Sequence, residues 1–260
     1  MWLAEDADTR IYILGSMHAL PQGTDWDDGA VGTAIDAADE LVMELSPAEL
    51  GAAAAAFRAL APREAPLAID ARLTGRALTG YRALEASGGS LNGDALDDWA
   101  VMVLMGQRIA QEAELVPDEG VETRLTERFE AVGKPIMGLE RAREQLMLFE
   151  TLGPAAQRAL LRRAAEKADS GVADVLAMTA AWGRGDVAAL ENVINEGIDA
   201  VPAARKAILT DRNRRWSAWA IERMERPGTV LMAVGAGHLV GEDGVPALLE
   251  ARGVRVRRVQ

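Results

Sequence analysis

Two histidines stand in the same short sequence frame at opposite ends of the chain. His18 lies in LGSMHALP and His238 in VGAGHLVG, and each has a glycine three positions before it, Gly15 and Gly235 respectively. The chain has only these two histidines in 260 residues. An imidazole ring can ligate a metal ion or exchange a proton near neutral pH. The shared frame predicts that both rings serve one site, although a single histidine after a strand is commonly a structural or surface residue.

Two glutamates lie at the carboxyl ends of apolar runs. Glu44 stands inside LVMEL, and Glu140 directly follows PIMGL. A carboxylate within an apolar run is costly to bury unless it is paired, hydrogen-bonded or bound to a metal ion. We therefore expect a functional role for Glu44, whereas Glu140 could equally cap the helix that is predicted to begin after it.

A further polar cluster occurs in DRNRRW, residues 211–216. Arg214 and Arg215 are typical of a solvated helix face. Arg212 and Asn213, which precede the tryptophan-rich stretch WSAW, could instead face a cleft as donors that stabilise an anion. Composition does not decide between these two interpretations.

The elements that must position these residues are short apolar strands. Four runs are typical of buried strands, namely Arg10–Leu14, Glu40–Leu45, Lys134–Leu139 and Thr229–Val234. The C-terminal run VRVRRV, residues 254–259, is typical of an edge strand. Residues 66–70 could form one more short extended piece.

The chain between these strands is alanine-rich and helical in pattern. Apolar residues recur at three-to-four spacing over residues 47–61, 74–86, 94–113, 119–132 and most of 141–224. Strands separated by helices favour parallel crossovers. We therefore predict an α/β fold with a central, mainly parallel sheet. It would be one domain over residues 1–260, with helical cap insertions at about 47–132 and 141–224.

This arrangement would bring the candidate residues together. His18 follows the first predicted strand by four residues, and His238 follows the Thr229–Val234 strand by four. Because parallel strands end at one edge of a sheet, the two histidines and the two glutamates should meet there, where open α/β sheets place ligand sites. Gly15 and Gly235 would permit positive φ angles and close backbone approach in the turns.

Composition excludes several classes of function. The net charge is −12, so neither a nucleic-acid partner nor an anionic membrane surface is expected. The absence of cysteine removes thiolate metal sites, thiol nucleophiles and disulfides. No apolar stretch reaches the ~18 residues of a membrane-spanning helix, and the polar residues before the first strand have neither the basic nor the apolar region that is typical of a leader. We expect a periplasmic or secreted protein if a leader has been removed, and otherwise a cytoplasmic one.

The motifs, in their order, resemble those of the TraB/GumN family, which is related to the TIKI metalloproteases. IYILGSMHALP resembles the first Gly-x-x-His block, LVMELSP the glutamate-bearing strand, and KPIMGLERAREQL the Gly-Leu-Glu block with Gln145. TAAWGRGDVAAL resembles the Gly-Asp helix-turn, DRNRRW the Arg-Asn-x-x-Trp block, and VLMAVGAGHLVGEDGVPALLEARGVRV the closing block. These blocks cover essentially the whole chain. One departure is Glu122 in GVETRLTERF, where an aspartate is usual.

The resemblance implies a fold related to that of the erythromycin esterases and the haem-binding ChaN-like proteins. It also implies metal-dependent hydrolysis of peptide bonds, with His18, His238 and Glu44 as the metal-site positions. Two imidazoles with carboxylates and no thiolate suit zinc, manganese, cobalt or ferrous iron. The expected cofactor is therefore a divalent metal ion. The expected partner is a peptide or protein substrate that the helical cap holds in an extended form.

A metal ion at this edge could lower the pKa of a bound water from about 15.7 toward 7. Glu44 or Glu140 would ligate the ion and the other would accept the proton of the water, while Arg212 and Asn213 would stabilise or orient the tetrahedral intermediate. Two alternatives stay open. One is a metal-independent, esterase-type hydrolase in which histidine and glutamate activate water directly. The other is a non-catalytic protein that holds haem or a metal. Substrate and oligomeric state do not follow from the sequence.

Overall fold

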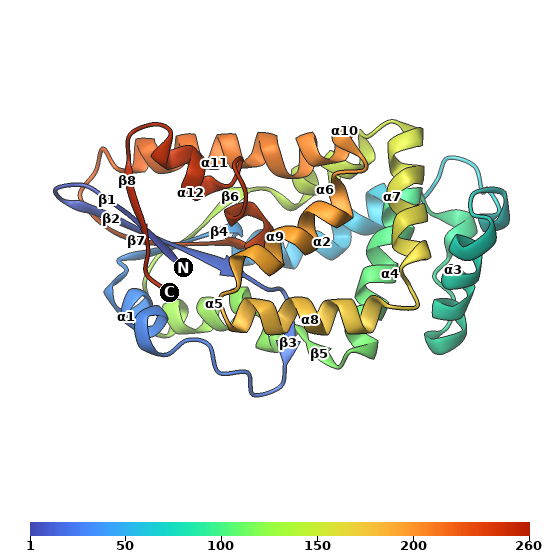
Figure 1. The fold of residues 1–260 in the computed structure, drawn as a ribbon, viewed down its shortest axis with the longest axis horizontal. Coiled ribbons are helices and arrows are strands. Elements are labelled where there is room, and N and C mark those ends of the chain that lie inside the picture. The colour runs from blue at the N-terminus through green and yellow to red at the C-terminus, as the bar shows by residue number, and fades with distance from the viewer.

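A six-stranded sheet in the order β6-β4-β7-β2-β1-β8 lies in the left part of the view in Figure 1, and a group of helices extends to its right. The computed structural model describes the backbone of all 260 residues and every side chain except that of Asn195. The parallel strands are β6 (Ile136–Glu140), β4 (Glu40–Leu45), β7 (Gly228–Gly235) and β2 (Thr9–Ser16). Two antiparallel strands, β1 (Trp2–Glu5) and β8 (Arg255–Arg258), extend the sheet beyond β2. The predicted α/β class with a mainly parallel sheet is confirmed.

Helices fill the connections between the strands. The first connections contain α1 (Gly29–Ala37), α2 (Pro47–Leu60), α3 (Gly75–Gly88), α4 (Asp98–Glu112) and α5 (Val121–Ala131). The long connection from β6 to β7 contains α6 (Ala142–Glu150), α7 (Pro154–Glu166), α8 (Gly171–Gly183), α9 (Val187–Ile198), α10 (Pro202–Arg205) and α11 (Asp211–Arg223). Helix α12 (Val245–Glu250) precedes β8. Short 3₁₀ turns occur at η1 (Ile69–Ala71), η2 (Gly93–Ala95), η3 (Pro117–Glu119) and η5 (Ala236–Leu239), and a π-helical turn, η4 (Lys206–Thr210), leads into α11.

Each face of the sheet is covered by its own helices, because successive strand residues point to opposite faces. On β4, Leu41 and Met43 pack into one core with α1 and α5, whereas Val42 packs into the other core with α11 and α12. Figure 1 shows α11 and α12 on one side of the sheet and α1 and α5 on the other. Fully burying an aromatic or branched side chain such as Phe129 or Leu125 stabilises the fold by about 1.5–3 kcal/mol each.

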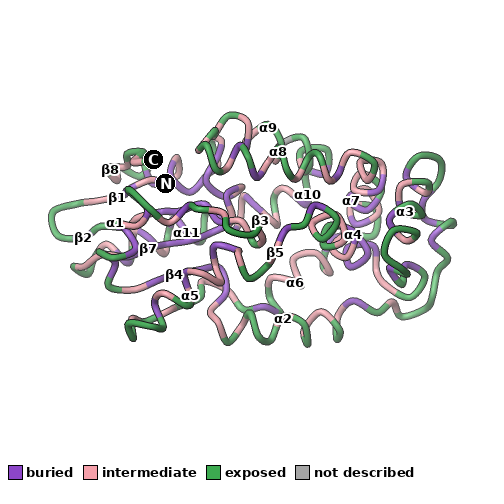
Figure 2. The backbone as a smooth tube through the Cα atoms, turned by 90° about the horizontal axis from the view of Figure 1, so that it is seen from below, coloured by how far each residue is buried: buried purple, intermediate pink, exposed green. Residues whose placement is uncertain are grey.

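The predicted helical insertions divide into two parts. Within each insertion one helix, α5 or α11, covers the sheet, and the other helices extend away from it (Figure 1). The distant helices α3, α4 and α7 enclose a separate apolar core that includes Tyr81, Met105 and Leu161. Figure 2 shows the contrast in burial between the central strands and α2, of which no residue is buried. Among the described residues, no helix is long and apolar enough to cross a membrane.

The structure confirms the five predicted strands and corrects one extended piece. Residues 66–70 do not form a strand. Ile69 instead begins a 3₁₀ turn, and its backbone N–H donates to the Asp94 side chain at 2.7 Å. Strand β1 was not predicted, because it is only four residues long and its stability comes from pairing with β2 and β8 at once. The interpretation as one domain stays a prediction.

Candidate active site

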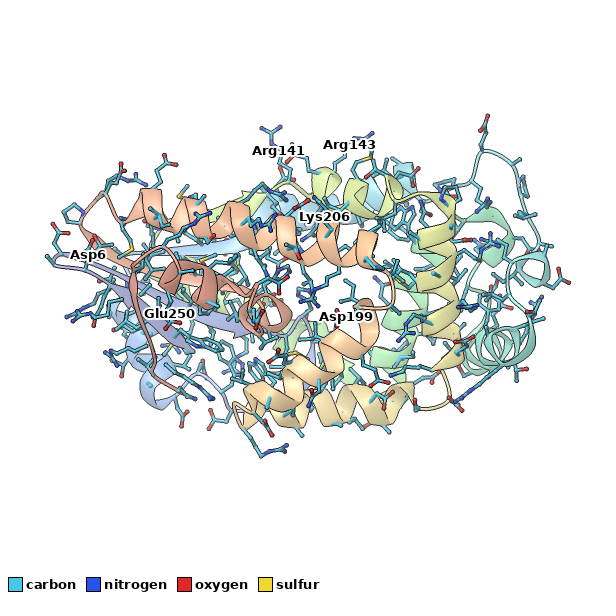
Figure 3. All side chains as sticks on the ribbon, turned by 45° about the horizontal axis from the view of Figure 1, so that its top comes forward. Asp6, Arg141, Arg143, Asp199, Lys206 and Glu250 are labelled. Atoms are coloured by element: carbon cyan, nitrogen blue, oxygen red, sulfur yellow. The ribbon has the colours of Figure 1, made fainter. Side chains whose placement is uncertain are left out.

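The carboxyl edge of the parallel strands carries the predicted polar residues. Glu44 is the penultimate residue of β4, and Glu140 is the last residue of β6. Glu140 pairs with Leu45, the residue after Glu44, so the two glutamates lie close to the same sheet edge. His18 follows β2 by two residues, and His238 lies in the 3₁₀ turn that follows β7. Arg141, directly after Glu140, is exposed and projects away from the body of the protein (Figure 3).

Arg212 is the centre of a buried cluster at this edge. Its side chain is 5 % exposed, and its guanidinium lies 4.5 Å from the ring of Trp216. Nε and Nη2 donate to Glu140 at 2.8–3.1 Å, and Nη2 also donates to Glu44 at 2.6 Å. Nη1 donates to the carbonyl oxygen of Ile208, in the π-helical turn, at 3.2 Å and to Nε2 of His238 at 2.9 Å. A guanidinium has five N–H groups, and here all five have acceptors within the protein.

Glu44 is held in its ionised form. Its Oε1 accepts from the backbone N–H of Gly235 at 2.8 Å, and its Oε2 accepts from Nε2 of Gln145 at 2.8 Å as well as from Arg212. Burial alone would raise the pKa of this carboxyl, but the charge of Arg212, the charge of nearby His18 and the hydrogen bond from Gly235 together outweigh it, and the pKa is lowered to about 2. Both oxygens are therefore occupied by donors.

His238 is held as a neutral ring of one tautomer. Asn213 donates its amide N–H to the carbonyl oxygen of Asp243 at 2.8 Å, so its Oδ1 must accept the hydrogen from Nδ1 of His238 at 2.6 Å. Nε2 then carries a lone pair that accepts from Arg212. Burial lowers the pKa of His238 to about 3, because water cannot reach the ring to solvate its protonated, charged form. Oε1 of Glu44 lies 3.9 Å from Nε2 of this ring.

His18 differs from His238 because its ring is anchored on one side and open on the other. Nδ1 contacts Oε1 of Glu122 at 2.9 Å, and the side chain is 79 % exposed. The carboxylate of Glu122 raises the pKa of His18 to about 9 through its charge and its hydrogen bond. Among the described side chains, Nε2 of His18 has no hydrogen-bond partner. Glu44 and Arg212 are close enough for their charges to act on this pKa, although neither contacts the ring.

Glu122 holds His18 from the first turn of α5. Its Oε1 also accepts from the hydroxyl of Ser16 at 2.6 Å, while its Oε2 is buried without a partner among the described residues. Burial alone would raise the pKa of Glu122, but the contact with His18 lowers it overall. The pair is thus an imidazole whose orientation is set by a carboxylate, with its other nitrogen facing solvent.

As placed, these residues do not fit the expected divalent metal ion. Among the described residues, no group of three or more His, Asp or Glu side chains could hold one. The lone pair of His238 already accepts from Arg212, and the guanidinium lies between Glu44 and Glu140. A metal ion between these carboxylates would meet a fixed positive charge. The roles predicted for these residues, and a metal bound to His18, His238 and Glu44, stay predictions.

Comparison with known proteins identifies the family. The sequence model of the TraB/PrgY/gumN family matches residues 1–258. The chain belongs to this family. No curated protein and no solved structure matches it. This match confirms the family that the sequence motifs indicated.

In this member of the TraB/PrgY/gumN family, the glycines of the two histidine frames serve close packing. Neither has a positive φ angle, so that part of the expectation is wrong. A Cβ on Gly15 would lie 3.1 Å from the Cα of Ala236, and a Cβ on Gly235 would lie 3.1 Å from Oε1 of Glu44. Glycine near the ends of β2 and β7 therefore avoids tight contacts with Ala236 and with the carboxylate of Glu44.

Sequence reasoning did not assign a role to Glu122. The residue was noted only as a departure from the aspartate that is usual after Gly-Val. A carboxylate within the first turn of a helix is commonly explained by the helix dipole, and Glu122 lies 104 residues from His18. The signal that could have identified it is the family's usual aspartate at this position, because an acidic residue kept there suggests a partner for one of the histidines.

We predict that Gly120, which precedes α5, keeps His18 in place. An alanine Cβ there would overlap the carbonyl oxygen of His18. Gly120→Ala should lower the free energy of unfolding by about 1–3 kcal/mol, measured by urea denaturation. Gly153 is the matched control, because it also precedes a helix, has φ −58° and ψ 151° against −59° and 149°, and has open space at its Cβ position. An equal effect of Gly153→Ala would contradict this explanation.

Proposed function

We propose that the protein is a hydrolase in which His18 moves the proton of an attacking water during cleavage of an ester or amide bond. The observation that carries this proposal is the open Nε2 of an otherwise anchored ring. Nδ1 of His18 is held by Glu122, whereas the polar atoms of Glu44, Glu140 and His238 are engaged within the cluster around Arg212. Among these groups, His18 is the one that can reach a substrate.

The proposed reaction uses His18 first as a base and then as an acid. In its neutral form, Nε2 takes one proton from water while the water oxygen bonds to the carbonyl carbon of the substrate. When the tetrahedral intermediate collapses, the bond to the leaving oxygen or nitrogen breaks and Nε2–H returns the proton to that atom. Glu122 stabilises the imidazolium that exists between the two steps, in the way a buried carboxylate serves a catalytic histidine in other hydrolases.

The cluster around Arg212 supplies a fixed wall beside this ring. Glu44 and Glu140 each contribute one negative charge and Arg212 one positive charge, so with a neutral His238 the wall has a net charge of −1. Within this wall Glu44 raises the pKa of His18, as Glu122 does, and Arg212 lowers it; the effect of Glu44 is the larger, so the wall slightly favours the imidazolium form. We therefore assign Glu44, Glu140, Arg212 and Asn213 a positioning role rather than contact with the reacting atoms.

A second candidate is the metal-dependent peptidase that the family resemblance implied, acting on an extended polypeptide. One observation favours it. Each histidine has its Nδ1 held by an acceptor, Glu122 or Asn213, and metal-ligating histidines are usually held in this way. Arg212 would have to leave Nε2 of His238 before that ring could ligate an ion. Manganese, cobalt or zinc would then supply a Lewis acid to the site.

We predict that activity survives removal of metals. Protein purified without chelators would be analysed for bound metal and assayed on an aryl ester and on an unfolded polypeptide, before and after dialysis against EDTA. We expect kcat/KM to stay within about twofold, since the proposed chemistry uses only side chains. A loss of tenfold or more that Mn²⁺, Co²⁺ or Zn²⁺ restores would contradict the proposal and support the peptidase. His18→Gln is the control that assigns the measured activity to this site.

A further inference from the structure

A cavity of about 210 Å³ lies beside the two histidine turns and is lined in part by residues of α1 and α8, which lie on the same side of the sheet in Figure 1. Gly15 and Ala236 form part of its wall. The indole N–H of Trp182, in α8, donates to the carbonyl oxygen of Gly15 at 2.8 Å. This hydrogen bond connects α8 to β2. None of the polar residues of the candidate active site lines the cavity, so it is a separate site and does not depend on the proposed function.

The interior of the cavity is aromatic and aliphatic. Trp26 and Trp182 meet edge to face with their ring centroids 6.3 Å apart. Val31, Leu190 and Val240 contribute aliphatic surface. Trp26 is 7 % exposed, and its indole N–H is buried without a partner. An apolar cavity of about 150 Å³ already accepts benzene, so this space is large enough for one aromatic ring with a short polar end.

The rim of the cavity carries unpaired charges of both signs. Asp25 and Asp28, before α1, and Arg184, after α8, are exposed and line the cavity. Among the described side chains, none of these three makes an ion pair. Arg258 also lines the cavity and stacks on Trp2 at 6.0 Å, while its N–H groups donate to backbone carbonyls of Gly185 and Gln260. The rim can therefore bind a cation and an anion at the same time.

We infer that this cavity binds a zwitterionic small molecule with one aromatic ring, of the class of an aromatic amino acid. The ring would lie against Trp26 and Trp182, where aromatic contacts favour edge-to-face or offset geometry. The carboxylate would pair with Arg184, and the ammonium group would pair with Asp25 and Asp28. A ligand in this position would contact Gly15 and Ala236, which line the cavity and precede His18 by three positions and His238 by two.

The test is calorimetric titration of the full chain with three probes, L-phenylalanine, 3-phenylpropionate and 2-phenylethylamine. L-Phenylalanine should bind with a Kd at or below about 1 mM, and each singly charged probe should bind at least about fivefold more weakly. Arg184→Gln should weaken L-phenylalanine at least about fivefold and leave 2-phenylethylamine unchanged. Arg143→Gln is the matched control, because Arg143 is exposed, does not line the cavity and projects from the outside of the molecule (Figure 3).

Val187→Trp, which fills part of the cavity from the start of α9, should abolish binding of L-phenylalanine. Three results would overturn the inference. They are no saturable binding of L-phenylalanine at millimolar concentration, equal binding of 3-phenylpropionate, and unchanged binding by Arg184→Gln. The arginine variant changes an exposed side chain, so the test does not depend on whether the tryptophan variant folds.

Discussion

Replacing Arg212 by methionine is expected to lower the free energy of unfolding by about 3–5 kcal/mol at pH 7, because it leaves buried carboxylates without their cation. The side chains of Glu44 and Glu140 are 11 % and 8 % exposed, and both depend on Arg212 for charge-assisted hydrogen bonds. The measurement is urea denaturation followed by far-UV circular dichroism. Arg215→Met is the control, because its side chain is 55 % exposed and contacts Glu140 only at 3.4 Å. That variant should change stability by less than about 1 kcal/mol.

The effect of Arg212→Met should depend on pH in a defined direction. The pKa of Glu44 is about 2 in the folded protein and about 4.5 when unperturbed, so its ionisation stabilises the fold above pH 4.5 and is lost as the pH falls toward 2. Without Arg212, burial raises this pKa and the folded variant takes up a proton instead. The difference in stability between wild type and variant should therefore shrink below about pH 5. A constant difference from pH 7 to pH 4 would contradict this account.

The same variant tests whether the guanidinium of Arg212 is what prevents a divalent metal ion from binding between these residues. Removing the guanidinium frees Nε2 of His238 and the carboxylates of Glu44 and Glu140, all of which are suitable ligands for zinc or manganese. Zn²⁺ or Mn²⁺ should then raise the melting temperature of Arg212→Met, and should leave that of the wild type unchanged. An increase for the wild type, but not for the variant, would favour the metal-dependent alternative.

Most of the sheet could be predicted from the sequence because its strands are short apolar runs between breakers. Glu40–Leu45 was predicted with the bounds that β4 has, since a buried parallel strand is apolar on both faces. Residues 66–70 were misinterpreted because an apolar pattern over five residues does not distinguish a strand from a turn. There, the hydrogen bond from Ile69 to Asp94 decides the conformation, and a contact across 25 residues is not visible in a local pattern.

The site could be predicted only in part, for a similar reason. The carboxyl ends of parallel strands must meet, so the placement of Glu44, Glu140 and His238 at one edge followed from the strand assignments. Which groups hydrogen-bond to each other depends on side-chain directions that the spacing does not determine. Arg212 was expected to act as a donor toward an anion, yet each of its N–H groups has an acceptor in the protein. Glu122 was given no role because it lies in the first turn of a helix rather than at the end of a strand.

Replacing His18 by glutamine is expected to lower kcat/KM by about 10²–10⁴, the range for loss of a general acid–base group. The fold should be retained, because the side chain is 79 % exposed and its ring packs into no core cluster. The matched measurement is urea denaturation, in which the variant should still unfold in one cooperative transition, with a midpoint lowered only by the loss of the partly exposed contact with Glu122. Unchanged kcat/KM in a folded His18→Gln protein would exclude this residue from the reaction.

The pH dependence gives a sharper test of the same residue. Because the reaction requires neutral His18, kcat/KM should rise with pH to a midpoint near 9. Glu122→Gln removes the charge that raises this pKa but keeps an acceptor for Nδ1, so the midpoint should fall by about 1–2 pH units toward the usual value for histidine. Asp118→Asn is the control, because it removes an exposed carboxylate from the turn before α5 and should leave the midpoint unchanged.

The two histidines also make the titration of His18 directly observable without a substrate. In a nitrogen-15 NMR titration, one ring should titrate near pH 9 and the other should stay neutral down to about pH 3, because Arg212 and burial hold His238 in its Nδ1–H form. Glu122→Gln should move only the first titration. Two rings that both titrate near pH 6.5 would contradict the anchored pair and the buried cluster together. A shift in the NMR titration without a matching shift in kcat/KM would show that His18 is held as described but is not the catalytic base.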